Sequence, residues 1–145
     1  MKKYFLTFLA FVLFQTAMAQ APNITCNWDG QNLSVTGKDA VGQSHYKGVM
    51  FTGRFDIGTS EGFRTLSIAF PAQEGTFNLA SGSKETEIRV NSSNISFSST
   101  SDIPIQGTIT VSSVNNRRVT ATFSFTVEYN GSRKRFTGNF NHCAY

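Results

Sequence analysis

The clearest pattern in the chain is a strict alternation of apolar and polar residues over positions 119–129. Every second residue is apolar, in the order Val119, Ala121, Phe123, Phe125, Val127 and Tyr129. Threonine, serine and glutamate occupy the positions between them. Side chains alternate between the two faces of a β-strand, whereas an α-helix repeats every 3.6 residues, so the spacing predicts a strand with one buried and one solvated face.

The segments on either side predict two neighbouring strands. Thr108–Val114 alternates through its isoleucine and valines and then slips at Ser112-Ser113, which indicates a β-bulge. A tight turn is expected over Val114–Arg117, because asparagine tolerates the positive φ that such turns need.

After the alternating strand, Asn130-Gly131 is a strong hairpin signal, so the chain should return over Arg133–Phe140. In the returning strand, Arg135 and Thr137 should face away from Phe136. The pattern therefore predicts a three-stranded antiparallel meander over residues 107–141.

Upstream, shorter runs of β-branched and aromatic residues between glycines and prolines predict six further strands. They are Asn32–Thr36, Tyr46–Ile57, Phe63–Phe70, Thr76–Leu79, Thr86–Val90 and Asn94–Ser98. About nine short strands at this spacing predict an all-β fold, a single antiparallel β-sandwich, with a small β-barrel as the alternative.

The first twenty residues follow a different pattern. Lys2-Lys3 precede about a dozen apolar residues, and Ala17-Met18-Ala19 follow them, as in a secretory signal peptide. We expect a signal helix over residues 1–19, cleavage after Ala19, and one domain over residues 20–145 that is secreted or periplasmic. The alternative, a transmembrane anchor, needs about 20 apolar residues. A lipid anchor would need a cysteine directly after the cleavage point, so stable membrane insertion is not expected after processing.

Charge gives little indication of a partner. The chain carries 13 basic and 9 acidic residues, and removal of Lys2 and Lys3 with the leader reduces the net charge from +4 to +2. Two basic clusters, Arg117-Arg118 and Arg133–Arg135, lie on either side of a strand of about 35 Å at roughly 3.3 Å per residue. Nucleic-acid binding would need one continuous basic patch, so the sequence argues against it.

Cys26 and Cys143 are the two cysteines of the chain. In an oxidising compartment two cysteines usually pair, so we expect a disulfide that joins the two ends of the domain. The alternatives are a catalytic thiol and two unpaired buried cysteines.

The C-terminal third carries a recognisable pattern in three segments, Gly107-Thr-Ile-Thr-Val, Val119-Thr-Ala-Thr-Phe-Ser-Phe-Thr and Phe136-Thr-Gly-Asn-Phe-Asn. This pattern resembles uncharacterised secreted and lipoprotein β-sandwich domains of Bacteroidetes, and Gly75-Thr-Phe-Asn-Leu79 is similar to their short upstream strand. The chain departs from them at Ala121, where a glycine is common, and in lacking a lipid-bearing cysteine. The resemblance implies a fold and a compartment, in a soluble periplasmic or released form, but no activity.

Candidate catalytic residues have weak support. Gly58–Gly62 matches the G-x-S-x-G nucleophile motif around Ser60, but that motif needs a helix after the serine and a strand is predicted there. Asp39, Ser44 and His45 could be drawn as a triad, yet neighbouring strand residues point to opposite faces. We expect no catalytic residue and no enzyme activity.

Metal and cofactor sites are not expected either. His45 and His142 are expected to be surface residues, and no C-x-x-C or H-x-x-x-H spacing occurs. Glu85 and Glu87 would share one strand face; they could bind calcium or act in acid–base chemistry, but a solvated edge face is the simpler interpretation.

The sequence therefore favours a secreted, non-enzymatic binding or structural module whose partner is an unknown protein or a glycan. The alternatives are a periplasmic inhibitor or immunity-type protein and a carbohydrate-binding module. A sugar-binding platform could use Trp28 or Tyr46, although Trp28 is expected to pack against the disulfide. Binding loops are expected at Gly58–Gly62, Gly37–Ser44 and Ser99–Gly107.

Overall fold

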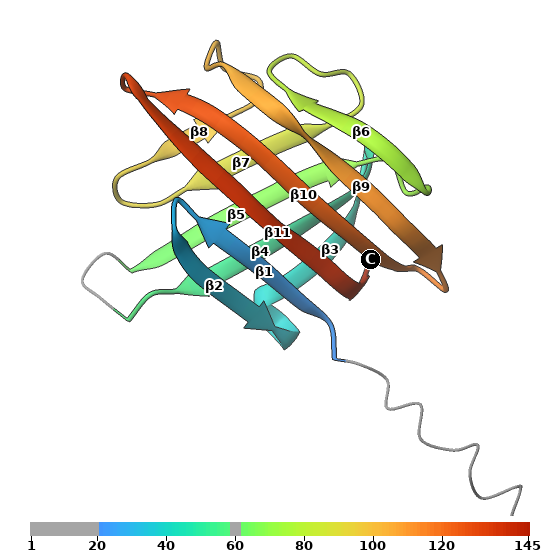
Figure 1. Ribbon diagram of the computed structural model, residues 1–145. Coiled ribbons are helices and arrows are strands. Elements are labelled where there is room, and N and C mark those ends of the chain that lie inside the picture. The colour runs from blue at the N-terminus through green and yellow to red at the C-terminus, as the bar shows by residue number, and fades with distance from the viewer. Residues whose placement is uncertain (1–20, 59–61) are drawn as a thin grey trace, which may run out of the picture.

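The computed structural model describes residues 21–58 and 62–145, which form two antiparallel β-sheets stacked face to face (Figure 1). Sheet A contains, in spatial order, β2 (Gln31–Thr36), β1 (Asn23–Trp28), β11 (Ser132–Ala144), β10 (Arg118–Tyr129), β9 (Ile105–Asn115) and β6 (Gly75–Ala80). Sheet B contains β3 (Ala40–His45), β4 (Gly48–Asp56), β5 (Phe63–Phe70), β7 (Glu87–Asn91) and β8 (Ser96–Ser98). A short 3₁₀ turn, Gly37–Asp39, carries the chain from β2 to β3.

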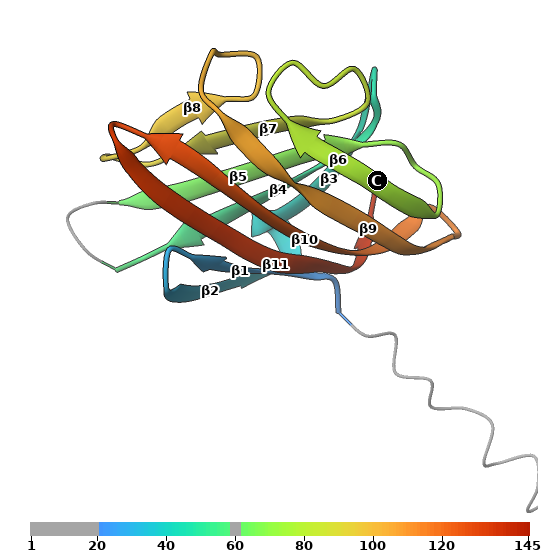
Figure 2. The same ribbon diagram turned by 45° about the horizontal axis from the view of Figure 1, so that its top comes forward.

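The two sheets are separate layers, and Figure 2 shows β9, β10 and β11 passing in front of the strands of sheet B. Because each sheet ends in its own edge strands, the fold is an open sandwich and not a closed barrel. The predicted β-sandwich is confirmed, and the barrel alternative is wrong.

Phenylalanine side chains hold the layers together. The ring of Phe140 on β11 is fully buried, with its centroid 5.3 Å from that of Phe51 on β4 and 5.9 Å from that of Phe70 on β5. Within sheet A, Phe125 and Phe136 stack with centroids 4.8 Å apart. Aromatic rings bury large areas, so these contacts supply much of the hydrophobic stabilisation between the sheets.

The predicted meander is confirmed and is longer than expected. β9, β10 and β11 pair as antiparallel neighbours between Ile105 and Ala144, with register shifts in both ladders near Thr120, and Phe136 is buried while Arg135 lies on the solvent side. The predicted bulge is also confirmed: Thr120 pairs with Ser113 and Ala121 pairs with Val111, which leaves Ser112 as the extra residue. The turn after β9 lies one residue later than predicted.

The strand count was underestimated, since the described residues form eleven strands and the sequence predicted about nine. The missing strands are β1 and β3. In β3, Gly42 lies against the ring of Phe51, and a Cβ there would overlap that ring. The inward positions of β3 therefore carry small residues and give no apolar alternation. Another error concerns the strand predicted at Tyr46–Ile57, because residues 46 and 47 form the turn before β4.

The predicted disulfide between Cys26 and Cys143 is wrong in this structure. Both thiols are free and buried. The register of β1 and β11 pairs Cys26 with Gly138, and Cys143 lies five residues beyond Gly138 along β11, or about 16 Å at 3.3 Å per residue. A disulfide needs Cα atoms within about 7 Å, so the strands would have to unpair before a bridge could form.

Candidate functional site

The solvent side of sheet A is covered by short, uncharged polar side chains in two rows that cross all six strands. By strand register, one row consists of Thr76, Thr110, Thr122, Asn139, Thr25 and Ser34. The neighbouring row consists of Asn78, Thr108, Ser124, Thr137, Asn27 and Asn32. All are exposed or half-buried. We call these two rows the hydroxyl–amide face.

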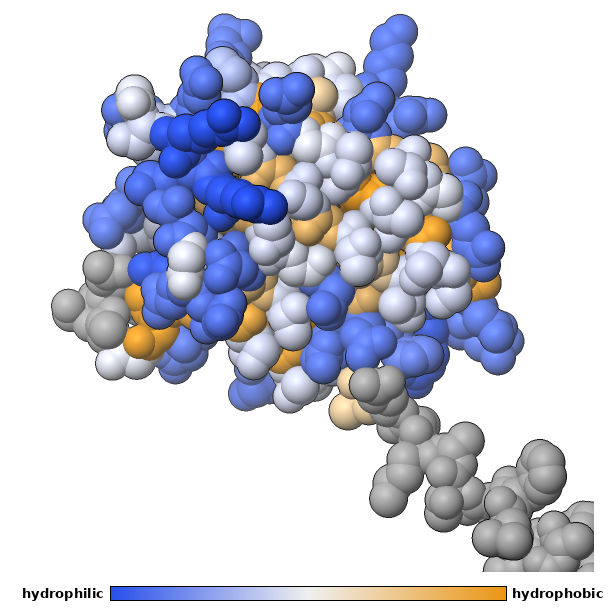
Figure 3. All heavy atoms as spheres, in the orientation of Figure 1, coloured by the Kyte–Doolittle hydropathy of each residue, from blue (hydrophilic) through white to orange (hydrophobic). Residues whose placement is uncertain are grey.

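Figure 3 shows pale residues over the centre and right of this side of the molecule, and more strongly hydrophilic residues over its left part and along the bottom. Strands lie about 4.8 Å apart and alternate residues about 6.7 Å apart along a strand, so the polar groups repeat at these spacings. Hydroxyl and amide groups both donate and accept hydrogen bonds. Some are paired within the face: the Thr76 and Thr110 hydroxyls lie 3.0 Å apart, and Asn27 Nδ2 donates to Asn32 Oδ1 at 2.7 Å.

The composition of the hydroxyl–amide face is unusual for a solvated sheet. Surfaces of small domains normally intersperse both signs of charge, and protein-binding surfaces are enriched in aromatic residues and arginine. None of the twelve residues in the two rows is charged or aromatic. The face is therefore chemically suited to many weak hydrogen bonds with a hydroxyl-rich ligand.

A shallow groove of about 650 Å³ borders this face on β9, β10 and β11. Its walls include Gln106, Thr126, Arg133 and Arg135, and the strand segments Gly107-Thr108 and Ser124-Phe125 complete it. The groove is thus continuous with the second row of the face, which contributes Thr108 and Ser124.

Another hollow, of about 400 Å³, opens at the end of the sandwich where the β1–β2, β7–β8 and β10–β11 connections come together. Its charged groups have partners in the protein: Lys134 Nζ lies 2.7 Å from Asp29 Oδ2, and Arg64 donates to Gln31 Oε1 at 2.7 Å. A ligand there would have to compete with these contacts. This hollow is the weaker candidate.

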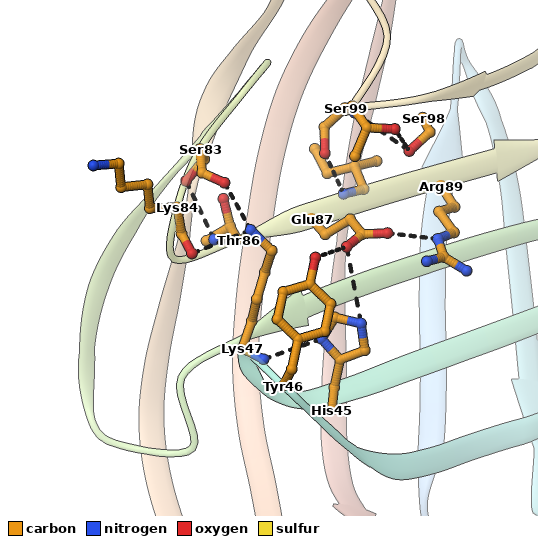
Figure 4. Close-up of polar contacts among 12 residues, drawn as sticks. His45, Tyr46, Lys47, Ser83, Lys84, Thr86, Glu87, Arg89, Ser98 and Ser99 are labelled. Atoms are coloured by element: carbon orange, nitrogen blue, oxygen red, sulfur yellow. Dashed lines mark hydrogen bonds and ion pairs between the residues drawn. The ribbon is translucent and has the colours of Figure 1, made fainter.

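On the solvent side of sheet B, polar side chains converge on the carboxylate of Glu87 (Figure 4). The Tyr46 hydroxyl donates to Glu87 Oε2 at 2.8 Å, and Arg89 Nε lies 2.6 Å from Oε1. His45 Nε2 lies 3.8 Å from Oε2, and its ring packs against that of Tyr46 with centroids 4.2 Å apart. The β3–β4 turn thus folds over β7 and leaves Glu87 only 3% exposed.

The environment of Glu87 has opposing effects on its pKa. Burial alone would raise it, but the hydrogen bonds from Tyr46 and Arg89, together with the charges of Arg89 and His45, outweigh burial, so the pKa is lowered from its ordinary value of 4.5. The carboxylate is therefore charged at neutral pH and held by its donors. This geometry fixes the turn; it leaves little room for a ligand.

The structure corrects some of the sequence-based expectations about single residues and confirms others. Glu85 and Glu87 do not form a solvated pair, because Glu85 is exposed before β7 whereas Glu87 is buried. His45 is not a surface residue, since its side chain is 10% exposed, while His142 is exposed as expected. Trp28 is buried as expected, but it packs edge-on against Phe136 at 5.0 Å instead of against a disulfide.

The candidate catalytic groups do not assemble among the described residues. His45 contacts Lys47 and Glu87, and no hydrogen bond joins it to Asp39 or Ser44. Ser60 of the G-x-S-x-G match lies outside the described residues. Burial raises the pKa of the Cys26 thiol to about 12 and that of Cys143 to about 11, so both are protonated and unreactive at neutral pH.

In residues 21–58 and 62–145, no three histidine, cysteine, aspartate or glutamate side chains gather in a way that could hold a metal ion. The same residues include no helix long and apolar enough to cross a bilayer.

The geometry of residues 21–58 and 62–145 defines the class of this protein as an antiparallel β-sandwich of eleven strands, with two rows of uncharged polar side chains on one sheet face. Comparison with known proteins adds no closer relationship: no family model, curated protein or solved structure matches the chain. The resemblance to Bacteroidetes domains stays a prediction.

Proposed function

We propose that this protein is a secreted, non-enzymatic binding module that holds a polysaccharide against the hydroxyl–amide face of sheet A. The observation that carries the proposal is the register of that face, which aligns twelve hydroxyl and amide side chains across six strands. A polysaccharide presents hydroxyl groups at regular intervals along an extended chain. Groups that both donate and accept can match such a ligand in several registers.

The same face argues for a glycan rather than a protein as the partner. Binding energy between proteins is concentrated in buried tryptophan, tyrosine and arginine side chains. The two rows contain none of these. Tyr46, one of the two aromatic platforms considered from the sequence, is 78% exposed but lies at the β3–β4 turn of the other sheet, where its hydroxyl is bonded to Glu87.

The proposal of a non-enzymatic role is supported by the state of the reactive side chains. Glu87 is held by Tyr46 and Arg89, and both thiols are buried and protonated. Export through the leader at residues 1–19 would place the domain where extracellular polysaccharides occur.

Affinity electrophoresis of residues 20–145 through gels containing single polysaccharides, neutral and acidic, tests this function. Retardation by at least one polymer is expected. Thr122→Glu and Thr108→Glu should weaken that retardation at least ten-fold, because each places a charge in the centre of the face. Thr65→Glu is the matched control, since Thr65 lies on the outer side of sheet B opposite Arg54 in register.

Equal loss in Thr65→Glu and Thr122→Glu would contradict the assignment to sheet A. Failure of every polysaccharide to bind, together with capture of a periplasmic enzyme from the native envelope, would favour the inhibitor alternative instead.

A further inference from the structure

The groove beside the hydroxyl–amide face is lined by hydrogen-bond donors and by no carboxylate. Arg133 and Arg135 project from β11, and the hydroxyls of Thr108, Ser124 and Thr126 line β9 and β10. Guanidinium groups only donate, and hydroxyls can turn to donate. A site with this lining is complementary to an anion with several acceptor oxygens.

Arg133 and Arg135 give the groove its positive charge, and the exposed Glu128 lies opposite Arg133 in the register of β10 and β11. The two arginines occupy alternate positions of β11, so their side chains lie on the same side of sheet A. In the part of the chain that the structure describes, no ion pair joins either of them to an acid. Arg133 makes only a long contact with a neutral group, with Nη2 3.5 Å from Thr126 Oγ1. Lys134, between them, points away and pairs with Asp29.

The floor of the groove includes a glycine of β9, Gly107. Gly107 lies where β9 and β10 approach so closely that a Cβ would overlap the Ser124 carbonyl oxygen and the backbone of Phe125. Gly107 alternates with the buried Ile105 and Ile109, so its missing side chain would point to the inner side of sheet A, and the glycine lets the strands of the groove floor lie close together.

We propose that this groove binds a tetrahedral oxyanion, a sulfate or phosphate monoester carried by the polysaccharide that lies on the hydroxyl–amide face. Arginine pairs with such groups through two parallel N–H donors. Arg133 and Arg135 would donate to one side of the anion, and the hydroxyls of β9 and β10 would donate to its remaining oxygens. The claim that a polysaccharide carries the anion rests on the proposed function. The claim that the groove binds the anion does not.

The ion is tested first, with inorganic sulfate and inorganic phosphate added to the isolated domain, residues 20–145, at constant ionic strength. Amide chemical shifts should change at Gly107, Ser124 and Arg135. Arg135→Gln and Arg133→Gln should each weaken binding at least five-fold, and the double variant should abolish it. Arg117→Gln removes the same charge at the other end of the meander and should change the affinity less than two-fold.

The source of the anion is tested by affinity electrophoresis with a sulfated polysaccharide and its desulfated form. Stronger retardation by the sulfated polymer, lost in Arg133→Gln/Arg135→Gln, supports the proposal. Ion binding with equal retardation by both polymers would mean that the groove takes free ions only, which would overturn the polymer-borne assignment. Absence of ion binding in wild-type protein, or ion binding that survives the double variant, would overturn the anion site even if neutral polysaccharides still bind.

Discussion

At the scale of single residues, Glu87 shows how a buried carboxylate can anchor a surface turn. Its donors come from the β3–β4 turn and from its own strand, so the carboxylate ties sheet B to a connection that would otherwise stand free. Hydrogen bonds to charged groups contribute about 1.5–3 kcal/mol to stability when they are fully formed.

Glu87→Gln is expected to lower the free energy of unfolding at neutral pH by about 1.5–3 kcal/mol. Because the pKa of Glu87 is lowered in the folded state, its stabilising effect is present above the ordinary pKa of 4.5 and is lost as the pH falls through the lowered value. The thermal unfolding temperatures of wild type and variant, measured from neutral to strongly acidic pH, should therefore become equal at low pH. Glu85→Gln, outside the cluster, should leave the pH profile close to that of wild type.

The two thiols are expected to stay unmodified in the folded protein. Burial raises both pKa values, so neither Cys26 nor Cys143 forms a thiolate at mildly alkaline pH. Ellman's reagent should react with neither thiol in native conditions and with both after denaturation in guanidinium chloride. A purified protein with no free thiols after denaturation would show that a disulfide forms after all.

At the scale of elements, short-range signals predicted some strands well and others not at all. β5 was predicted to the residue at Phe63–Phe70, because a glycine and a proline bound a segment in which Leu66, Ile68 and Phe70 occupy alternate positions. β1 was missed although its hairpin turn carries an Asp-Gly signal, with Asp29 at φ 50° and Gly30 at φ 96°. Reading that dipeptide as a turn would have revealed β1, with β3 still missing.

The turns at the two ends of β10 allow a paired prediction. Both have positive φ at their two central residues, but the second central residue is Arg117 (φ 57°) in one and Gly131 (φ 73°) in the other. The left-handed region costs an L-residue about 1–2 kcal/mol. Replacing Arg117 with glycine removes this cost, but the larger conformational entropy of glycine in the unfolded chain offsets part of the gain in stability. Arg117→Gly should therefore stabilise the protein by about 0.5–1 kcal/mol.

Gly131→Ala should destabilise the protein by about 1 kcal/mol. No heavy atom lies within 4 Å of the added Cβ, so only the backbone conformation contributes. Urea unfolding of the two variants measures both effects. Changes of the same sign in both would contradict the assignment of the two turns to one type.

At the scale of the whole molecule, the sandwich depends on a few rings that contact both sheets. Phe140→Ala should lower the free energy of unfolding by about 3–5 kcal/mol, because it removes contacts with Phe51, Phe70 and Phe123 and leaves a cavity. Since small domains have about 5–15 kcal/mol in total, urea unfolding should show a large shift of the midpoint. Phe63→Ala, at a position 45% exposed whose ring lies 3.7 Å from Arg54 Cζ, should change it by only about 1 kcal/mol.

The candidate site could be predicted only in part from the sequence. The alternation over 119–129 places Thr122 and Ser124 on a solvated face, and the hairpin places Thr137 beside them. That Thr76 and Asn78 extend the same rows depends on β6 pairing with β9, a long-range contact that no local pattern encodes. The groove beside Arg133 and Arg135 lies within the predicted meander, but the strand pattern alone did not identify it as a hollow.

The pairing of the first strand with the last has a consequence for how the molecule is made. β1 lies between β2 and β11, and Asn23 pairs with Asn141. During synthesis or export, β1 can therefore pair with β2 early, but it cannot pair with β11 until residues 132–144 have emerged. Loop closure over such a separation slows folding. A version cut short before β11 would leave β1 and β10 with unsatisfied edges and should aggregate.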